Sequence, residues 1–213
     1  MALKITEIYK SIQGESTHAG RPCTFIRLTG CPLRCRWCDT VYSFEGGKTL
    51  QISEIMTEVS AAGVPLVELT GGEPLAQPEA VPLMQKLIDN GYSVLLETGG
   101  SEPIDSVPQE VCIILDVKCP GSGMADRNRW ENLGKLRPHD EVKFVIASRE
   151  DFDWAVAKAG EYRLPERHVV LFSPAFGLVK PRDLAAWILE TNLNVRLQIQ
   201  QHKYIWDPRA KGV

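Results

Sequence analysis

The sequence predicts an α/β protein whose strands form an incomplete parallel barrel. Short runs rich in β-branched residues recur along the chain, and most are almost continuously apolar, as expected for parallel strands covered on both faces. Helical patterns separate several of these runs, which indicates right-handed βαβ units. The connections 100–110 and 124–138 lack a full helical pattern, which excludes a complete eight-fold barrel.

The strand pattern occurs at 23–28, 65–70, 92–97, 111–117, 141–146, 168–173 and 194–199. Four helices are predicted among these strands. Apolar residues spaced i, i+3, i+4 and i+7 mark 51–63 and 79–91, and each segment ends in a glycine. A third helix ends near Gly160, and a fourth covers 180–192 with Pro181 in its first turn.

Length and composition bound the class of protein. With 213 residues, 44% hydrophobic and 24% charged, the chain can bury a full core, and we expect one domain over 1–213. A net charge of −3 gives no electrostatic reason to bind nucleic acid or an anionic membrane. The sequence shows neither the apolar run of a signal peptide nor about 18 consecutive apolar residues, which favours a cytoplasmic protein. Clustered cysteines in such a reducing compartment indicate metal binding or catalysis.

The stretch GCPLRCRWCDT, residues 30–40, places Cys31, Cys35 and Cys38 on a short loop directly after a predicted strand. Three thiolates this close can converge on one centre, and zinc or an iron–sulfur cluster is the usual occupant. Structural zinc normally takes four protein ligands, usually as separated pairs, which this trio does not provide. A [4Fe–4S] cluster on three thiolates leaves one iron open to a small molecule, so the sequence favours the cluster.

A second motif, ELTGGEP at 68–74, also ends a predicted strand. Its glycines allow a ligand to approach the backbone closely, and Glu73 can accept a hydrogen bond from an ammonium group. By itself this motif is as typical of a turn. Further polar residues follow predicted strands, where the loops of a parallel barrel converge over its mouth, so we expect one convergent site. They lie at Arg27, 97–100, 116–118, 172–174 and 198–204.

The two motifs together resemble the radical S-adenosylmethionine (SAM) superfamily, and the aromatic Trp37 before the third cysteine belongs to the same pattern. In that superfamily SAM chelates the open iron through its amino and carboxylate groups, and an electron from the cluster releases a 5′-deoxyadenosyl radical. The segments IYKSIQGES (8–16), FIRLTGCPLRCRWCDT (25–40) and QHKYIWDP (201–208) narrow the resemblance to the 7-carboxy-7-deazaguanine synthases of queuosine biosynthesis.

This resemblance implies a partial (βα)6-type TIM-like barrel with reduced helices. It also implies a lyase that converts 6-carboxy-5,6,7,8-tetrahydropterin to 7-carboxy-7-deazaguanine with loss of ammonia, in which SAM is a cofactor and is not consumed. Cys31, Cys35 and Cys38 are the implied cluster ligands, and Thr40 the implied Mg²⁺ ligand. The residues implied for SAM are Trp37, Cys38, Asp39, Gly71, Gly72, Glu73, Gly100, Asp116, Val117 and Lys118. Those implied for the substrate are Ile12, Gln13, Gly14, Glu15, Arg27, Thr98, His202 and Val213.

The chain also departs from the family pattern, which commonly has Ser-Pro-Lys where this sequence has Asp-Val-Lys at 116–118. The resemblance further implies a homodimer and an electron donor such as flavodoxin or ferredoxin.

Two alternative functions stay open. A glycyl-radical activating enzyme of the same superfamily is disfavoured by Gln13 to Glu15 and by Thr40. A non-enzymatic zinc-binding module lacks an obvious fourth ligand and leaves Gly-Gly-Glu-Pro without a role.

Overall fold

The computed structural model describes residues 1–213. Its strands are β1 (Ala2–Ile12), β2 (Pro22–Leu28), β3 (Lys48–Gln51), β4 (Leu66–Gly71), β5 (Ser93–Thr98), β6 (Cys112–Val117), β7 (Glu141–Ile146), β8 (Val169–Pro174) and β9 (Arg196–Leu197). Its α-helices are α1 (Ile52–Ala62), α2 (Ala80–Asp89), α3 (Arg149–Glu161), α4 (Pro181–Leu189) and α5 (His202–Ile205). None of the helices combines the length and the apolar character needed to cross a bilayer.

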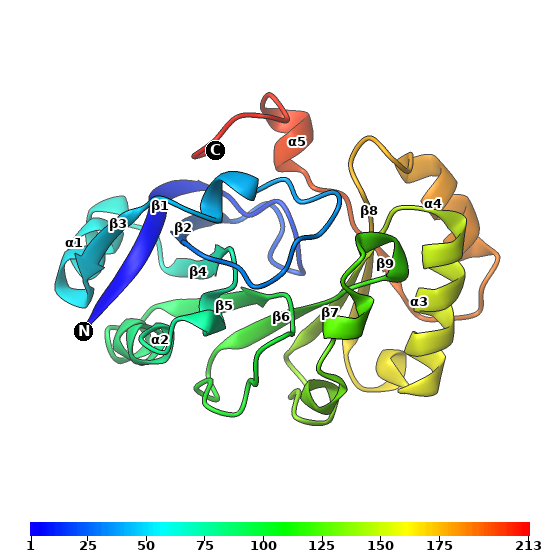
Figure 1. Ribbon diagram of the computed structural model, residues 1–213, viewed down its shortest axis with the longest axis horizontal. Helices are drawn as coiled ribbons and strands as arrows, with labels where there is room; N and C mark the ends of the chain where they lie inside the picture. Colours follow the sequence, from blue (N-terminus) through cyan, green and yellow to red (C-terminus); the bar gives the residue numbers. More distant parts are fainter.

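All nine strands belong to one sheet, in the order β3-β1-β2-β4-β5-β6-β7-β8-β9. Every pair from β2 to β9 is parallel, whereas β1 pairs antiparallel with both β2 and β3. Figure 1 shows this sheet curving from α1 and β3 on one side to α3 and α4 on the other. The six strands β2, β4, β5, β6, β7 and β8 form the incomplete parallel barrel, so the predicted fold class is confirmed.

The connections explain why the helix count is low. No α-helix joins β5 to β6 or β6 to β7, and the second of these connections consists of loops and short 3-10 turns. Segments 100–110 and 124–138 lie there, as expected from their weak helical patterns. Where the pattern is strong, the helix forms: α1 begins with a capping box between Gln51 and Glu54 and ends at Gly63, whose φ of 66° is left-handed.

Three parts of the sheet differ from the sequence prediction. Strand β1 was not predicted, because its apolar residues alternate with charged and polar ones and it is covered less than the parallel strands. Strand β3 is short and mostly exposed, so its sequence carries no apolar run. The predicted strand 194–199 shrinks to the two residues of β9, both exposed, at the edge of the sheet.

The parallel strands present two different faces. Their outer side chains pack against the helices in a core of 33 buried residues. The inner side chains form a second, small apolar cluster made of Cys23, Phe25, Leu66, Leu95 and Ile114. Side chains alternate along a strand, so the polar residues two positions after these apolar ones also point into the barrel interior.

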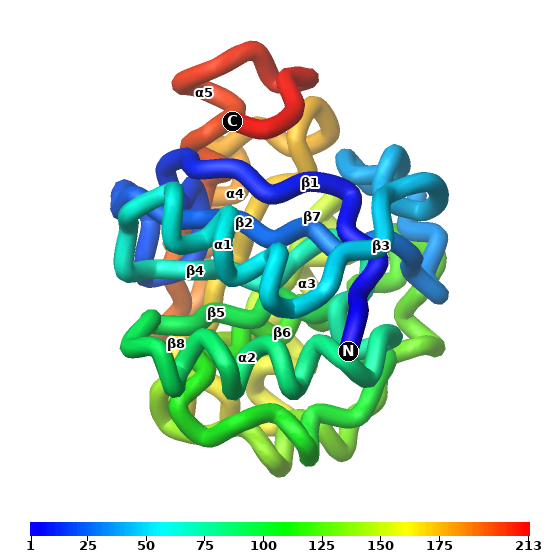
Figure 2. Tube along the Cα trace, turned by 90° about the vertical axis from the view of Figure 1, so that its left-hand side faces the viewer, coloured from blue at the N-terminus to red at the C-terminus, as the bar shows by residue number.

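The C-terminal segment returns to the start of the chain. Figure 2 shows it above β1, and the backbone N–H of Gln201 donates to the carbonyl of Gly14 at 3.0 Å. This contact brings α5 against the loop between β1 and β2. Two of the sequence motifs that lie almost 190 residues apart, at 8–16 and 201–208, therefore become neighbours.

Candidate active site

A cavity of about 900 Å³ opens at the carboxyl ends of the parallel strands. This is the end of a parallel barrel where loops converge and ligands bind, and the volume suits a cofactor together with a small substrate. The cavity wall includes every residue that the sequence predicts for the cluster, for Mg²⁺ and for the substrate. It also includes those predicted for SAM, with the exceptions of Gly100 and Val117.

The two exceptions have a geometric cause. Val117 alternates with Asp116 along β6, so its side chain joins the core behind the sheet. Gly100 faces away from the cavity, and its carbonyl accepts from the N–H of Arg129 and from the side chain of Asn132. Any contact of Val117 with a ligand in the cavity is therefore not made by its side chain.

The three cysteines of the 30–40 loop are half-buried free thiols on one wall of the cavity. The Gly-Gly pair at the end of β4 lets this loop lie close to the strand. A Cβ at Gly72 would stand 2.0 Å from the Gly30 carbonyl oxygen and 3.1 Å from Cys31 Cβ, so only glycine fits. No fourth cysteine lies on the wall. The donor set fits a cluster held by three thiolates.

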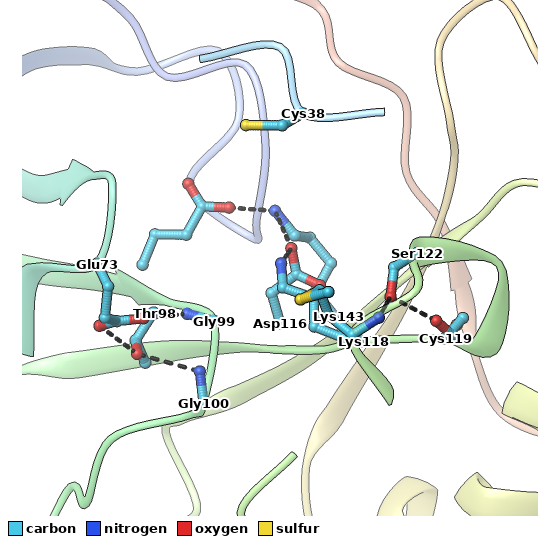
Figure 3. Close-up of polar contacts among 12 residues, drawn as sticks. Cys38, Glu73, Thr98, Gly99, Gly100, Asp116, Lys118, Cys119, Ser122 and Lys143 are labelled. Carbon is cyan, nitrogen blue, oxygen red and sulfur yellow. Dashed lines mark hydrogen bonds and ion pairs between the residues drawn. The ribbon is translucent and has the colours of Figure 1, made fainter. Parts of the chain in front are cut away.

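Glu73, fully buried, ties the Gly-Gly-Glu-Pro turn to the end of β5 (Figure 3). Its carboxylate accepts from Thr98 Oγ1 at 2.8 Å, from the Gly99 N–H at 2.8 Å and from the Leu75 N–H at 3.1 Å. Burial raises the pKa of Glu73 despite these donors. The hydroxyl of Thr98 is thereby engaged with Glu73, and it also accepts from the Gly100 N–H at 3.2 Å.

Arg27 lies on the opposite side of the cavity, on β2. Its Nε donates to Glu7 at 2.8 Å and its Nη2 to the hydroxyl of Tyr9 at 2.8 Å, while Nη1 has no protein partner. The guanidinium also lies 5.9 Å from the ring centres of Tyr9 and Tyr42. Burial raises the pKa of Tyr9 to about 12, so its hydroxyl keeps its proton. The arginine is held rigidly, with one donor nitrogen left for a ligand.

The barrel interior holds a network of buried charges around Lys143 of β7. Lys143 Nζ contacts Glu97, lies 3.0 Å from Glu15 Oε2 and lies 3.6 Å from Asp116 Oδ2. Burial acts to lower the pKa of Lys143, but the three carboxylates raise it well above its ordinary value. Burial likewise acts to raise the pKa of Glu15, yet Lys143 and the Gln200 amide bring it below its ordinary value. Lys143 and Glu15 are therefore both charged.

The pKa of Glu68 on β4 shifts in the opposite direction to that of Glu15. Glu68 is buried and its one hydrogen-bond partner is the side-chain amide of Gln13. Burial, followed by repulsion from Glu97 and Glu15, raises the pKa of Glu68 well above its ordinary value. The carboxyl group therefore holds its proton more strongly than an ordinary glutamate does.

The C-terminal residues close one side of the cavity. Lys203 Nζ donates to Asp39 Oδ2 at 2.6 Å, and this ion pair and the Gln200 amide outweigh burial, so the pKa of Asp39 lies below its ordinary value. His202 packs on Gly14, where a Cβ would come within 2.5 Å of the imidazole Nδ1. Burial lowers the pKa of His202, so the ring is neutral. Val213 ends the chain on the cavity wall.

Sequence reasoning missed several residues of this wall. They include Tyr9, Glu68, Lys143 and Lys203. A signal was present for Glu68 and Lys143, because each is a charged residue inside an otherwise apolar strand, at an inward-facing position. The roles of Tyr9 and Lys203 depend on the antiparallel strand β1 and on the return of the C-terminal segment, which local sequence patterns do not reveal.

The loop between β1 and β2 is anchored at the amino ends of the parallel strands. Glu141 accepts from the N–H of Thr17 at 3.1 Å, and it lies with His18 and Cys112 in a group whose ligand atoms are within 4.8 Å of one another. Each of the three has a protein partner, since His18 contacts Arg21 at 2.7 Å and Cys112 donates to the His139 carbonyl at 3.0 Å. The group fixes the loop that carries Gln13 and Glu15.

Comparison with known proteins agrees with this geometry. Residues 25–116 match the radical SAM superfamily. A curated protein from Koribacter versatilis, named 7-carboxy-7-deazaguanine synthase, is 50% identical over 99% of this chain and 100% of its own length. A protein of the same name from Chlorobaculum tepidum is 46% identical, over 99% of this chain and 97% of its own. The chain belongs to the 7-carboxy-7-deazaguanine synthase family.

Membership in this family makes the protein a radical SAM enzyme, for which a [4Fe–4S] cluster and SAM are the cofactors and a small molecule is the substrate. The fold agrees as well. The crystal structure of QueE from Escherichia coli superposes with a TM-score of 0.76 at 22% identity, over 94% of both chains. Streptococcus suis SuiB bound to SAM superposes with a TM-score of 0.57 over 80% of this chain and 48% of its own. SuiB, at 14% identity, therefore resembles this chain in fold over about half of its own length.

Proposed function

We propose that this enzyme converts 6-carboxy-5,6,7,8-tetrahydropterin to 7-carboxy-7-deazaguanine with loss of ammonia. The observation that carries the proposal is the shared cavity: the three-cysteine loop, Arg27, Glu15 and His202 all line it. A radical formed at the cysteine loop would reach a substrate held by these residues without leaving the cavity. Exclusion of water from such a site protects a reactive intermediate.

Cys31, Cys35 and Cys38 would hold the cluster, which supplies the electron that cleaves SAM to methionine and the 5′-deoxyadenosyl radical. The amino group of SAM would lie at the Gly71–Gly72 turn beside Glu73, whose Oε2 takes only one protein donor and keeps acceptor capacity. Asp116 would accept from SAM as well, because its Oδ1 is buried without a hydrogen-bond partner. Trp37 and Lys118 complete this side of the cavity.

The substrate would occupy the side of the cavity near β1 and β2. Arg27 would bind the substrate carboxylate through the free Nη1. Glu15 and Gln13 would hold the pterin ring, with neutral His202 against it. Mg²⁺ would bind Thr40, whose hydroxyl has only a 3.6 Å sulfur contact with Cys38 and is open to an oxygen-bound cation.

The proposal extends to the partners of the enzyme. Single-electron reduction of the cluster requires a donor such as flavodoxin or ferredoxin. We also propose a homodimer and a cytoplasmic location, which fit a biosynthetic enzyme that contains reduced cysteines.

Anaerobic reconstitution with iron and sulfide tests this function. The brown protein is incubated with dithionite, SAM, Mg²⁺ and carboxytetrahydropterin, and the products are resolved by mass spectrometry. We expect 7-carboxy-7-deazaguanine and ammonia, with many turnovers per SAM. Cleavage of SAM without deazaguanine would overturn the substrate assignment, and a colourless protein with one zinc ion would overturn the radical chemistry.

The magnesium site has a separate test. Thr40→Val removes the hydroxyl and keeps the side-chain volume, so we expect a higher Mg²⁺ concentration for half-maximal turnover with unchanged iron content. Ser43→Ala is the matched control, because its hydroxyl donates to the Thr40 carbonyl on the same loop and faces no ligand. An unchanged Mg²⁺ response in Thr40→Val would remove Thr40 from the metal site.

A further inference from the structure

Lys143 occupies the centre of the barrel, on β7, with 4% of its side chain exposed. Titratable groups face it from every neighbouring part of the barrel. They are Glu15 from the β1–β2 loop, Glu68 from β4, Glu97 from β5, Asp116 from β6 and Lys118 directly after β6. A lysine inside an apolar strand needs such partners, because an isolated buried ammonium group is strongly unfavourable.

The carboxylates do not depend equally on Lys143. Asp116 has a second cation, Lys118, whose Nζ lies 3.0 Å from Asp116 Oδ2. Glu15 has in addition the neutral amides of Gln198 and Gln200, each at 3.0 Å, and the imidazole of His202 facing it from α5. Glu97 has Lys143 and, at 3.4 Å, the hydroxyl of Thr70. Arg27 cannot substitute, since its guanidinium pairs with Glu7. Lys143 is thus the one cation that pairs with Glu15 and Glu97.

We propose that Lys143 is a positioning residue that holds the carboxylates of Glu15 and Glu97 turned toward the cavity, so that they accept N–H groups of the substrate. This inference rests on the proposed function. The pyrimidine edge of a pterin presents adjacent N–H donors, and an ionised carboxylate accepts from two donors at once, whereas a protonated carboxyl offers a donor of its own. Without Lys143, Glu15 would lose the cation that offsets its burial, so it would bind a proton more readily and lose this complementarity.

The test measures substrate binding separately from turnover. Reconstituted enzyme loaded with SAM, without reductant, is titrated with carboxytetrahydropterin by calorimetry. For Lys143→Met we expect a Kd about 30-fold higher or more, since one partner of a buried charged pair is lost. The control Lys135→Met removes an exposed lysine paired with Asp105, and its Kd should stay within about twofold of the wild type.

The pH dependence distinguishes positioning from a packing defect. In the wild type Glu15 is ionised, so Kd should stay flat between about pH 6 and 8. In Lys143→Met the pKa of Glu15 rises, so binding should become tighter as the pH increases over this range. Weakening that is equal at every pH, or binding equal to the wild type, would overturn the proposal.

Lys143→Arg keeps the cation, so it provides a second test in case the methionine variant does not fold. Its Kd should show the flat pH profile of the wild type, and a pH-dependent Kd in this variant would also overturn the proposal. In the double variant Lys143→Met/Glu15→Gln, the loss of binding free energy should be smaller than the sum of the two single losses. Both substitutions remove the same lysine–glutamate contact, so the second has less to remove. Failure of the proposed function gives a different result: the wild type itself would neither bind nor convert the pterin.

Discussion

Gly14→Ala tests the contact between the two ends of the chain. The added Cβ would stand 2.5 Å from His202 Nδ1 and 3.0 Å from the His202 backbone nitrogen. An ordinary contact needs about 3.5 Å, so the imidazole and α5 must retreat by about 1 Å. Overpacking of this kind costs about 1–3 kcal/mol. At about 2–4 °C per kcal/mol for a protein of this size, the melting temperature should fall by roughly 2–12 °C.

Activity should suffer more than stability in this variant. The helix α5 has only four residues near the end of the chain and can move away with the imidazole. A displacement of about 1 Å in a residue that positions substrate can lower turnover roughly 100-fold. Iron content should not change, because the three atoms nearest the added Cβ all belong to His202. The measurements are calorimetric melting, iron per chain and turnover of the reconstituted enzyme.

Gly160→Ala is the matched control, because a Cβ there meets nothing within 4 Å and the position lies inside α3. It should stabilise the protein by up to about 1 kcal/mol and leave turnover unchanged. Combining Gly14→Ala with His202→Ala should restore part of the lost melting temperature, since the clashing ring is gone and only the 3.0 Å contact with the backbone nitrogen remains. If Gly14→Ala alone kept both the melting temperature and the turnover of the wild type, the inferred packing of His202 on Gly14 would be wrong.

Three further predictions concern buried groups. Thr98→Val removes a donor to Glu73 in a fully buried site and should lower the free energy of unfolding in urea by about 1–3 kcal/mol; an unchanged midpoint would show that this hydrogen bond contributes nothing. The raised pKa of Glu68 means that the folded state holds a proton the unfolded chain releases, so the wild type should lose stability as the pH rises above the ordinary glutamate pKa of about 4.3, and Glu68→Gln should flatten this slope; an unchanged or steeper slope in the variant would contradict the assignment. Cys35→Ala should lose cluster iron and SAM cleavage while Cys119→Ala, a buried cysteine outside the cavity, keeps its iron; iron retained in Cys35→Ala would rule out that ligand.

The sequence revealed most of the barrel because parallel strands are buried on both faces and therefore read as apolar runs. Strand β1 was not predicted for the same reason. It is antiparallel and partly exposed, so lysine and glutamate alternate with its isoleucines and it shows no apolar run. Strand β9 was overestimated for the opposite reason: the run 194–199 has the residues of a strand, but only two of them pair, at the sheet edge. How many residues of an edge strand pair depends on how far the neighbouring strand runs beside it, which the local sequence does not show.

The residues of the candidate site also fall into two groups: those that the sequence predicted and those that only the fold brings together. The cysteines, Gly-Gly-Glu-Pro and Arg27 lie in contiguous motifs, so their residue types and spacing were sufficient to place them at the mouth of the barrel. The charge network required the fold. The register of β5, β6 and β7 brings Glu97 and Lys143 together, and Glu15 reaches them from the loop between β1 and β2. The engagement of the Thr98 hydroxyl with Glu73 likewise depends on tertiary contact.

The most direct test of the account is a crystal structure of the reconstituted enzyme with SAM, Mg²⁺ and carboxytetrahydropterin, grown without reductant. The account predicts a [4Fe–4S] cluster on Cys31, Cys35 and Cys38, with the pterin in the same cavity between Arg27 and Glu15. It also predicts the substrate carbon C6 facing the 5′ carbon of SAM. A single zinc ion on the cysteines, or a pterin bound outside the cavity, would contradict it.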